Sequence, residues 1–267
     1  MSFRCENENL EIHGGHSQNH NHDHGHDHGH DHDDDALLPT NPEQSLYTHI
    51  DNTKIKMLNA IGMSHVGRAS TLNMSSVFLK EQDNRFKIDT WLQSDTDCQM
   101  VIHIPFTSVC KIDSLIIRCN RPKISDEFDA PKAINIYKNW RRNVNIDFNT
   151  INSKRVKIDA TIEYPESVGI EPTSTDLINE DESSMIEYHL PKAKFNDCQS
   201  ITLFFKDNWS DDEDNLVNLY YLELRGSVSG KLRKDDTVPI MSVYESAPNP
   251  VDHQKVESDK NNVNIGM

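Results

Sequence analysis

Short runs in which apolar and polar residues alternate are the feature that most constrains the fold of this chain. The clearest run spans residues 155–164. Apolar side chains occupy every second position there: Val156, Ile158, Ala160, Ile162 and Tyr164. A period of two is typical of a half-buried strand, because successive side chains point to opposite faces of a sheet. We therefore expect these five side chains to face a core.

Similar runs, separated by turn residues, recur along the middle of the chain. They predict strands over residues 100–106, 111–119, 133–138, 155–164, 185–190, 199–206 and 219–225. Residues 46–58 are spaced irregularly and predict a short helix or strand with a loop. About eight strands without a long helix favour an all-β fold, a jelly-roll-like antiparallel β-sandwich.

Composition divides the chain into three parts. Residues 1–35 form a low-complexity His/Asp-rich tail that cannot bury apolar surface, so we expect it to be disordered. Residues 36–232 are predicted to form the sandwich, which 35% hydrophobic residues in a chain of 267 can support. The polar residues 233–267 predict a mostly extended or disordered tail.

The charge balance limits the possible partners. The formal net charge is −16, and residues 1–35, with nine Asp/Glu and one Arg, hold half of it. Such a chain repels phosphate backbones, so we expect no nucleic-acid binding. A local basic patch is formed in sequence by Lys138, Arg141, Arg142, Lys154, Arg155 and Lys157. We interpret this patch as solvated strand ends and a loop.

Membrane association and disulfide bonds are not expected. No apolar run approaches the roughly 20 residues that cross a bilayer, and the N-terminus lacks the apolar core of a signal peptide. The five cysteines are scattered and contain no Cys-x-x-Cys pair, which favours reduced thiols and excludes a thioredoxin-type active site. We therefore expect a soluble intracellular protein.

The N-terminal tail carries the strongest metal-ligand pattern. Its candidate ligands are His20, His22, His24, His26, His28, His30 and His32. Neutral imidazole binds Zn, Ni or Cu, but the repetitive spacing predicts loose binding rather than one defined site. The alternative is a tail that only improves solubility. We expect no other cofactor.

No catalytic constellation is visible. His103 lies between two isoleucines, where a ring at the surface or core edge is the expected role. The segment 226–230 places Val228 where a nucleophile elbow needs serine. The acidic clusters 94–97 and 210–214 lack calcium-loop spacing and are interpreted as solvated loop tips.

Trp140 and Trp209 each follow an asparagine at a predicted strand end, where they cap the core or anchor a partner.

The order of several landmarks resembles the PITH domain, a β-sandwich module named for proteasome-interacting thioredoxin-like proteins. The landmarks are Leu58-Asn59, Ser94-Asp95, Asp97, Ile104, Phe106, Leu115-Ile116-Ile117, Ala130-Pro131-Lys132, Tyr137, Asn139, Asp147-Phe148, Phe195-Asn196, residues 201–205, Asn208, residues 222–224 and Gly226. The C-terminal Tyr244-Glu245-Ser246-Ala247 and Asn249-Pro250-Val251-Asp252-His253 look like the tail of the stand-alone branch of this family, which lacks the thioredoxin domain.

The resemblance implies a jelly-roll-like sandwich without catalysis, residence in cytoplasm and nucleus, and association with the proteasome. The leading hypothesis is therefore a non-catalytic intracellular protein-interaction module, a monomer by default. A glycan-binding or small-molecule-binding jelly roll is an alternative, because such sandwiches often present ligand loops at one end. A metal-buffering protein that acts through its His-rich tail is the other.

Overall fold

Ten β-strands joined in one hydrogen-bonded ladder dominate the part of the chain that the computed structural model describes. That part is residues 38–69, 74–122, 127–140, 145–153, 155–171 and 175–232. The two predicted tails, residues 1–35 and 233–267, lie outside it. The strands are β1 (Lys56–Leu58), β2 (Ala60–Ser64), β3 (Gly67–Arg68), β4 (Thr90–Ser94), β5 (Met100–Cys119), β6 (Ala133–Lys138), β7 (Ala160–Glu163), β8 (Ile186–His189), β9 (Cys198–Phe205) and β10 (Asn218–Lys231).

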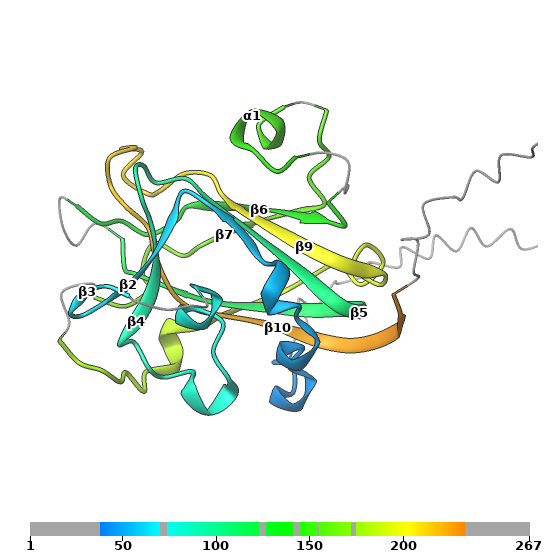
Figure 1. The fold of residues 1–267 in the computed structure, drawn as a ribbon. Helices are drawn as coiled ribbons and strands as arrows, with labels where there is room; N and C mark the ends of the chain where they lie inside the picture. The colour runs from blue at the N-terminus through cyan, green and yellow to red at the C-terminus, as the bar shows by residue number, and fades with distance from the viewer. Residues whose placement is uncertain are drawn as a thin grey trace, which may run out of the picture. The chain divides into compact units, whose positions relative to one another are not determined.

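Helical structure is short. One α-helical turn, α1 (Phe148–Ile151), follows β6. Single 3₁₀ turns are Pro42–Gln44, Tyr47–His49, Asn52–Lys54, Met74–Val77, Gln82–Asn84 and Glu182–Ser184. Figure 1 shows α1 on the β6 and β9 side of the domain, away from β10.

The 20-residue strand β5 belongs to two layers. Its first half pairs with β1 and β9, and β9 continues to β6 and β7, which together make the first layer. Its second half pairs with β8 and β10, and β10 continues to β4, β2 and β3, which make the second layer. Every pairing between named strands is antiparallel. The ladder therefore curls around one core, and the predicted antiparallel β-sandwich is confirmed (Figure 1).

The core is made by alternate residues of both layers. Fully buried examples are Ile102, Ile104, Leu115, Ile117, Ile134, Ile136, Leu203, Phe205, Leu222 and Leu224. Their intervening neighbours face outward, where Val101, Tyr137 and Phe204 form a second, smaller cluster. Alternation in the sequence thus separates two apolar sets, one inside the sandwich and one on the outer face of the first layer.

The prediction for residues 155–164 is only half right. Ala160 and Ile162 pack against the core and Tyr164 is fully buried, as expected. Ile158 is 43% exposed and Val156 packs against the outer cluster, so their expected place in the core is wrong. The β6–β7 ladder stops at Ala160 because the Asp159 carboxylate, instead of a main-chain carbonyl, accepts the Lys138 N–H at 2.7 Å.

The boundaries of other strands also differ from the prediction. The two strands expected at 100–106 and 111–119 form the single strand β5, since its hydrogen bonds pass from β9 to β10 near Pro105. β10 extends to Lys231, past a bulge at Gly226, where a Cβ atom would lie 1.9 Å from the Lys111 carbonyl oxygen. Only glycine fits this close approach. β2, β3 and β4 were not predicted.

Candidate functional site

A pocket of about 690 Å³ lies at the end of β6, beside residues 145–153 and 155–159, here called the α1 segment. Its lining residues are Tyr137, Lys138, Asn139, Trp140, Asn149, Thr150, Ser153, Arg155, Val156, Lys157 and Asp159. The volume falls within the roughly 300–1,000 Å³ that ligand pockets usually have. We call it the β6–α1 pocket.

The α1 segment is held over the first layer by apolar contacts. Ile151 is 4% exposed and packs in the small outer cluster with Val101, Tyr137 and Phe204. The Phe148 ring meets the Phe204 ring edge to face, with centroids 6.2 Å apart. The Asp147 side chain caps the turn by accepting the Thr150 N–H at 2.7 Å. This packing fixes one side of the pocket.

Asn139 fixes the other side by ending β6 in a sharp turn. Its φ of 50° lies in the left-handed region, which asparagine adopts more readily than most residues. Its side-chain Nδ2 donates to the Asp197 carbonyl at 2.8 Å, and its Oδ1 accepts the Gln199 N–H at 2.6 Å. The next residue, Trp140, stands edge-on to Tyr137 with ring centroids 5.6 Å apart. The pocket therefore has an aromatic wall anchored to two strands.

The charges around the pocket are unbalanced. Among the described residues, three cationic side chains line it, Lys138, Arg155 and Lys157, against one carboxylate, Asp159. None of the three cations forms an ion pair within the described part of the chain. One oxygen of Asp159 is already occupied by the Lys138 N–H. The site is thus locally positive in a chain whose formal net charge is −16.

The structure brings together residues that the sequence had suggested separately. Trp140 and half of the predicted basic patch, Lys138, Arg155 and Lys157, line one pocket. Arg141, Arg142 and Lys154 of that patch lie outside the described residues. No sequence pattern marks Asn149, Thr150 and Ser153 as pocket residues, since polar loop residues are common on any surface.

Trp209 has a structural role. Its indole N–H donates to the Tyr164 carbonyl at 2.9 Å, and its ring packs against the main core. The Lys132 ammonium lies 5.6 Å from the ring centroid. The expectation of core capping is therefore confirmed for Trp209, whereas Trp140 packs against the small outer cluster and lines the pocket.

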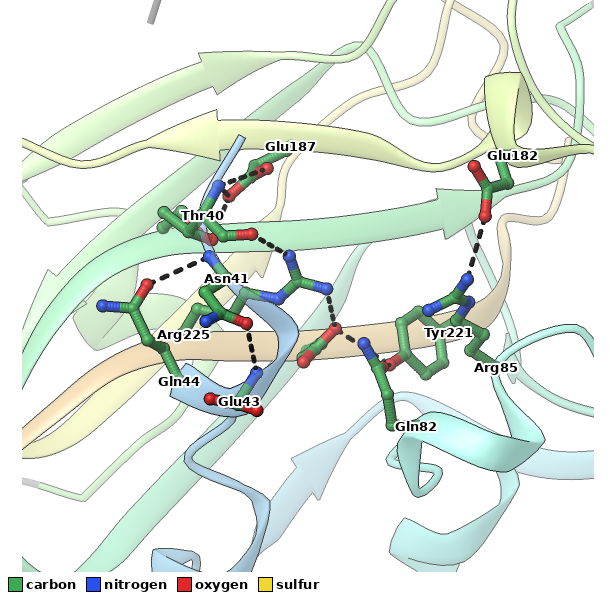
Figure 2. Close-up of polar contacts among 12 residues, drawn as sticks. Thr40, Asn41, Glu43, Gln44, Gln82, Arg85, Glu182, Glu187, Tyr221 and Arg225 are labelled. Carbon is green, nitrogen blue, oxygen red and sulfur yellow. Dashed lines mark hydrogen bonds and ion pairs between the residues drawn. The ribbon is translucent and has the colours of Figure 1, made fainter. Parts of the chain in front are cut away.

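The outer face of the second layer carries a different feature, a row of polar contacts shown in Figure 2. Arg225 pairs with Glu223 at 3.1 Å, and these side chains are only 8% and 4% exposed. Arg225 also donates to the Thr40 carbonyl at 2.7 Å, and the Tyr221 hydroxyl donates to Glu223 at 3.0 Å. Thr40 continues the row through hydrogen bonds to Glu187 on β8. The row fastens residues 38–46 to the sheet.

Arg118 on β5 performs the same task for residues 179–184. It is fully buried, and its Nε donates to the Ser184 hydroxyl at 2.7 Å. A further donor reaches the Asn179 carbonyl at 2.8 Å. Burial lowers the pKa of its guanidinium to about 10, still far above neutrality. The charged groups of Arg118, Glu223 and Arg225 on this face therefore all bond to other groups inside the fold.

The remaining ionisable candidates offer no reactive group. The His103 ring bonds to the Thr202 hydroxyl at 2.8 Å, and burial lowers its pKa to about 4, so it is neutral at pH 7. Cys98, Cys110, Cys119 and Cys198 are buried free thiols whose pKa burial raises, which makes them poor nucleophiles.

No metal site is found in the described ranges, where no three His, Cys, Asp or Glu side chains are grouped to hold an ion. The acidic clusters 94–97 and 210–214 lie close together, because the Cys98 N–H donates a hydrogen bond to the Glu213 carbonyl at 2.9 Å. The tail residues His20 to His32 lie outside the described residues, and their metal binding stays a prediction.

Among the described helices, none is long and apolar enough to cross a membrane.

Comparison with solved structures finds similarity to sugar-related modules. The C-terminal domain of a chitobiase from Bacteroides fragilis matches with a TM-score of 0.40 and 12% identity, over 68% of this chain and 99% of that one. A CBM32 module of a family 31 glycoside hydrolase from Clostridium perfringens gives 0.37 and 9%, over 72% and 100%. Similarity at this level says nothing about a ligand.

Comparison with known sequences is more informative. PITH domain-containing proteins of Drosophila pseudoobscura pseudoobscura and Schizosaccharomyces pombe are 28% and 24% identical, over 83% and 85% of this chain and 86% and 92% of their own lengths. PITH domain-containing protein 1 of Homo sapiens is 25% identical over 80% of this chain and 84% of its own. The family model of the PITH domain matches residues 37–248. This chain belongs to the PITH domain family.

Proposed function

We propose that this chain is a non-catalytic protein-interaction module and that the β6–α1 pocket is its binding site. The observation that carries the proposal is a half-buried tryptophan, Trp140, placed in a pocket of about 690 Å³ beside cations that have no acidic partner among the described residues. Binding hot spots are enriched in tryptophan, tyrosine and arginine, and all three residue types line this pocket. Membership of the PITH family supports an interaction role.

The proposed partner is the proteasome, met in the cytoplasm and nucleus. The support is the family name, which refers to proteins that interact with the proteasome. The pocket adds a physical reason, since the domain offers an anchored aromatic wall rather than a reactive group. The proposal therefore predicts association that depends on the side chain of Trp140.

Affinity purification from native lysate at moderate salt tests the proposal. The tagged full chain should recover proteasome subunits above a charge-matched control protein, and Trp140→Ala should reduce recovery at least fivefold. The matched control is Leu177→Ala, which shortens a 59% exposed apolar side chain outside the pocket. Thermal melts of both variants exclude unfolding as the cause. No recovery by the wild type would refute the partner, and equal recovery by both variants would refute the site.

Glycan binding is a second candidate, favoured by one observation. The pocket combines an aromatic wall with the polar side chains of Asn149 and Ser153, and aromatic rings with a few polar groups suit a sugar ligand. A thermal-shift screen against neutral mono- and disaccharides separates the two functions. A sugar at 100 times its dissociation constant should stabilise the fold by about 2.7 kcal/mol. Absence of any shift across the panel would remove this candidate.

A further inference from the structure

Two sets of arginine and lysine side chains in this domain differ in whether their charged groups bond to other groups of the fold. Arg118 and Arg225 are buried and bonded to carbonyl, hydroxyl and carboxylate groups. Lys138, Arg155 and Lys157 line the β6–α1 pocket and form no ion pair in the described ranges. Arg155 and Lys157 are exposed. Their charge is available to a ligand.

We infer that the β6–α1 pocket receives an acidic segment of a partner protein, whose carboxylates pair with Lys138, Arg155 and Lys157 while one of its apolar side chains packs against Trp140. The inference rests on the proposed function, because it names the chemistry of the same site. Lys and Arg bind carboxylates through charge-assisted hydrogen bonds, and Arg does so with a two-pronged fork.

The acidic character of the whole chain does not oppose this pairing at short range. At physiological ionic strength, exposed charges are screened beyond about 8 Å. A carboxylate inside the pocket therefore responds to the three cations that line it more than to the formal net charge of −16.

The pocket fits a peptide better than a nucleic acid. Nucleic-acid surfaces present a basic stripe that follows a backbone with one charge per about 1.7 Å of duplex. Here three cations surround a single pocket whose wall is partly apolar, formed by Tyr137, Trp140 and Val156. An aromatic pocket with a charged rim is typical of sites that anchor one apolar side chain of a protein partner.

A random twelve-residue peptide library displayed on phage and selected on the full chain tests the inference. Selected peptides should combine Asp or Glu with an aromatic or aliphatic residue. By fluorescence anisotropy, their Kd should rise at least tenfold for the double variant Arg155→Glu/Lys157→Glu and for Trp140→Ala. The matched control is Lys192→Glu, an exposed lysine outside the pocket, which should leave the Kd within twofold. The exposed positions of Arg155 and Lys157 protect the fold of the double variant.

Four results would overturn the inference. Selected peptides could be neutral or basic, or the double variant could bind acidic peptides as tightly as wild type. A twelve-nucleotide oligo(dT) could bind more tightly than any selected peptide at 0.15 M salt. Sedimentation could show self-association that the double variant abolishes, which would make a second copy of this chain the occupant.

The failure of this inference and the failure of the proposed function are distinguishable. If Trp140→Ala abolishes capture of the proteasome while selected peptides prove neutral, the acidic ligand is refuted and the binding site stands. If neither Trp140→Ala nor the double variant changes capture, the pocket is not the binding site and both proposals fall.

Discussion

The two layers of this sandwich cover their outer faces in opposite ways. The α1 segment lies on the first layer through apolar contacts of Ile151 and Phe148 with Val101, Tyr137 and Phe204. Residues 38–46 and 179–184 lie on the second layer through contacts of Arg225, Glu223 and Arg118. Figure 2 shows the contact of Arg225 with Thr40. The first cover, the α1 segment, is held by apolar contacts, and its cations form no ion pairs with described residues. The second cover, residues 38–46 and 179–184, is held by hydrogen bonds and an ion pair of buried charged side chains. The side with unused charge carries the pocket.

Removing one partner of the buried ion pair should have the largest effect on stability. Glu223→Ala leaves Arg225 charged and 8% exposed without its carboxylate, so the free energy of unfolding should fall by about 3–5 kcal/mol. Urea melts measure the loss. The control is Glu182→Ala, which breaks the exposed pair with Arg85 at 2.9 Å and should cost less than about 1 kcal/mol. Equal losses would mean that the second cover does not depend on buried charge.

Shortening an apolar side chain of the α1 segment should reduce the free energy of unfolding by less than loss of the ion pair does, but it should also disturb the β6–α1 pocket. Ile151→Ala removes buried methyl groups from a small cluster, and we expect a loss of about 2 kcal/mol, at the low end for such changes. Peptide affinity at the β6–α1 pocket should fall together with stability, since α1 would loosen. A variant that melts earlier yet binds unchanged would show that the pocket does not need this cover.

A pair of substitutions on one segment tests where β7 begins. Ile162→Asp places a charge against the core and should cost about 1–3 kcal/mol, whereas Ile158→Asp alters a side chain that is 43% exposed and should stay within about 0.5 kcal/mol. Urea melts of both variants beside wild type provide the comparison. A larger loss for Ile158→Asp would restore the continuous strand over 155–164.

Titration of His103 gives a pH-dependent effect on the first layer. Burial lowers the pKa of its imidazole from 6.5 to about 4, so between these values the unfolded chain binds the extra proton. The free energy of unfolding should therefore be unaffected by His103 above pH 6.5 and fall as the pH drops from 6.5 to 4. His103→Gln should flatten that part of the profile relative to wild type. Identical profiles for the two proteins would contradict the buried, neutral ring.

The strand pattern could be predicted where alternation coincides with hydrogen-bonded partners. Residues 133–138 were predicted as a strand and form β6 with the same limits. Residues 155–159 alternate equally well but lack a ladder partner, since Asp159 supplies a side-chain acceptor in place of a carbonyl. Periodicity reports which face of a segment is apolar, and it cannot report whether a neighbouring strand is present.

The pocket could be predicted only in fragments. Trp140 and the cations Lys138, Arg155 and Lys157 each stood out in the sequence. Their meeting depends on the Asn139 turn and on the packing of Ile151 under α1, which are tertiary contacts. The polar row of the second layer had no sequence signal, because Glu223 and Arg225 occupy the outward positions where charged residues are ordinary.

Hydrogen exchange of the full chain, with and without purified proteasome, tests most directly the claim that the first cover binds and the second only stabilises. The account predicts that binding slows exchange in residues 145–153 and 155–159 and leaves residues 38–46 and 179–184 unchanged. Slowed exchange in residues 38–46 and 179–184, with none in the α1 segment, would contradict it.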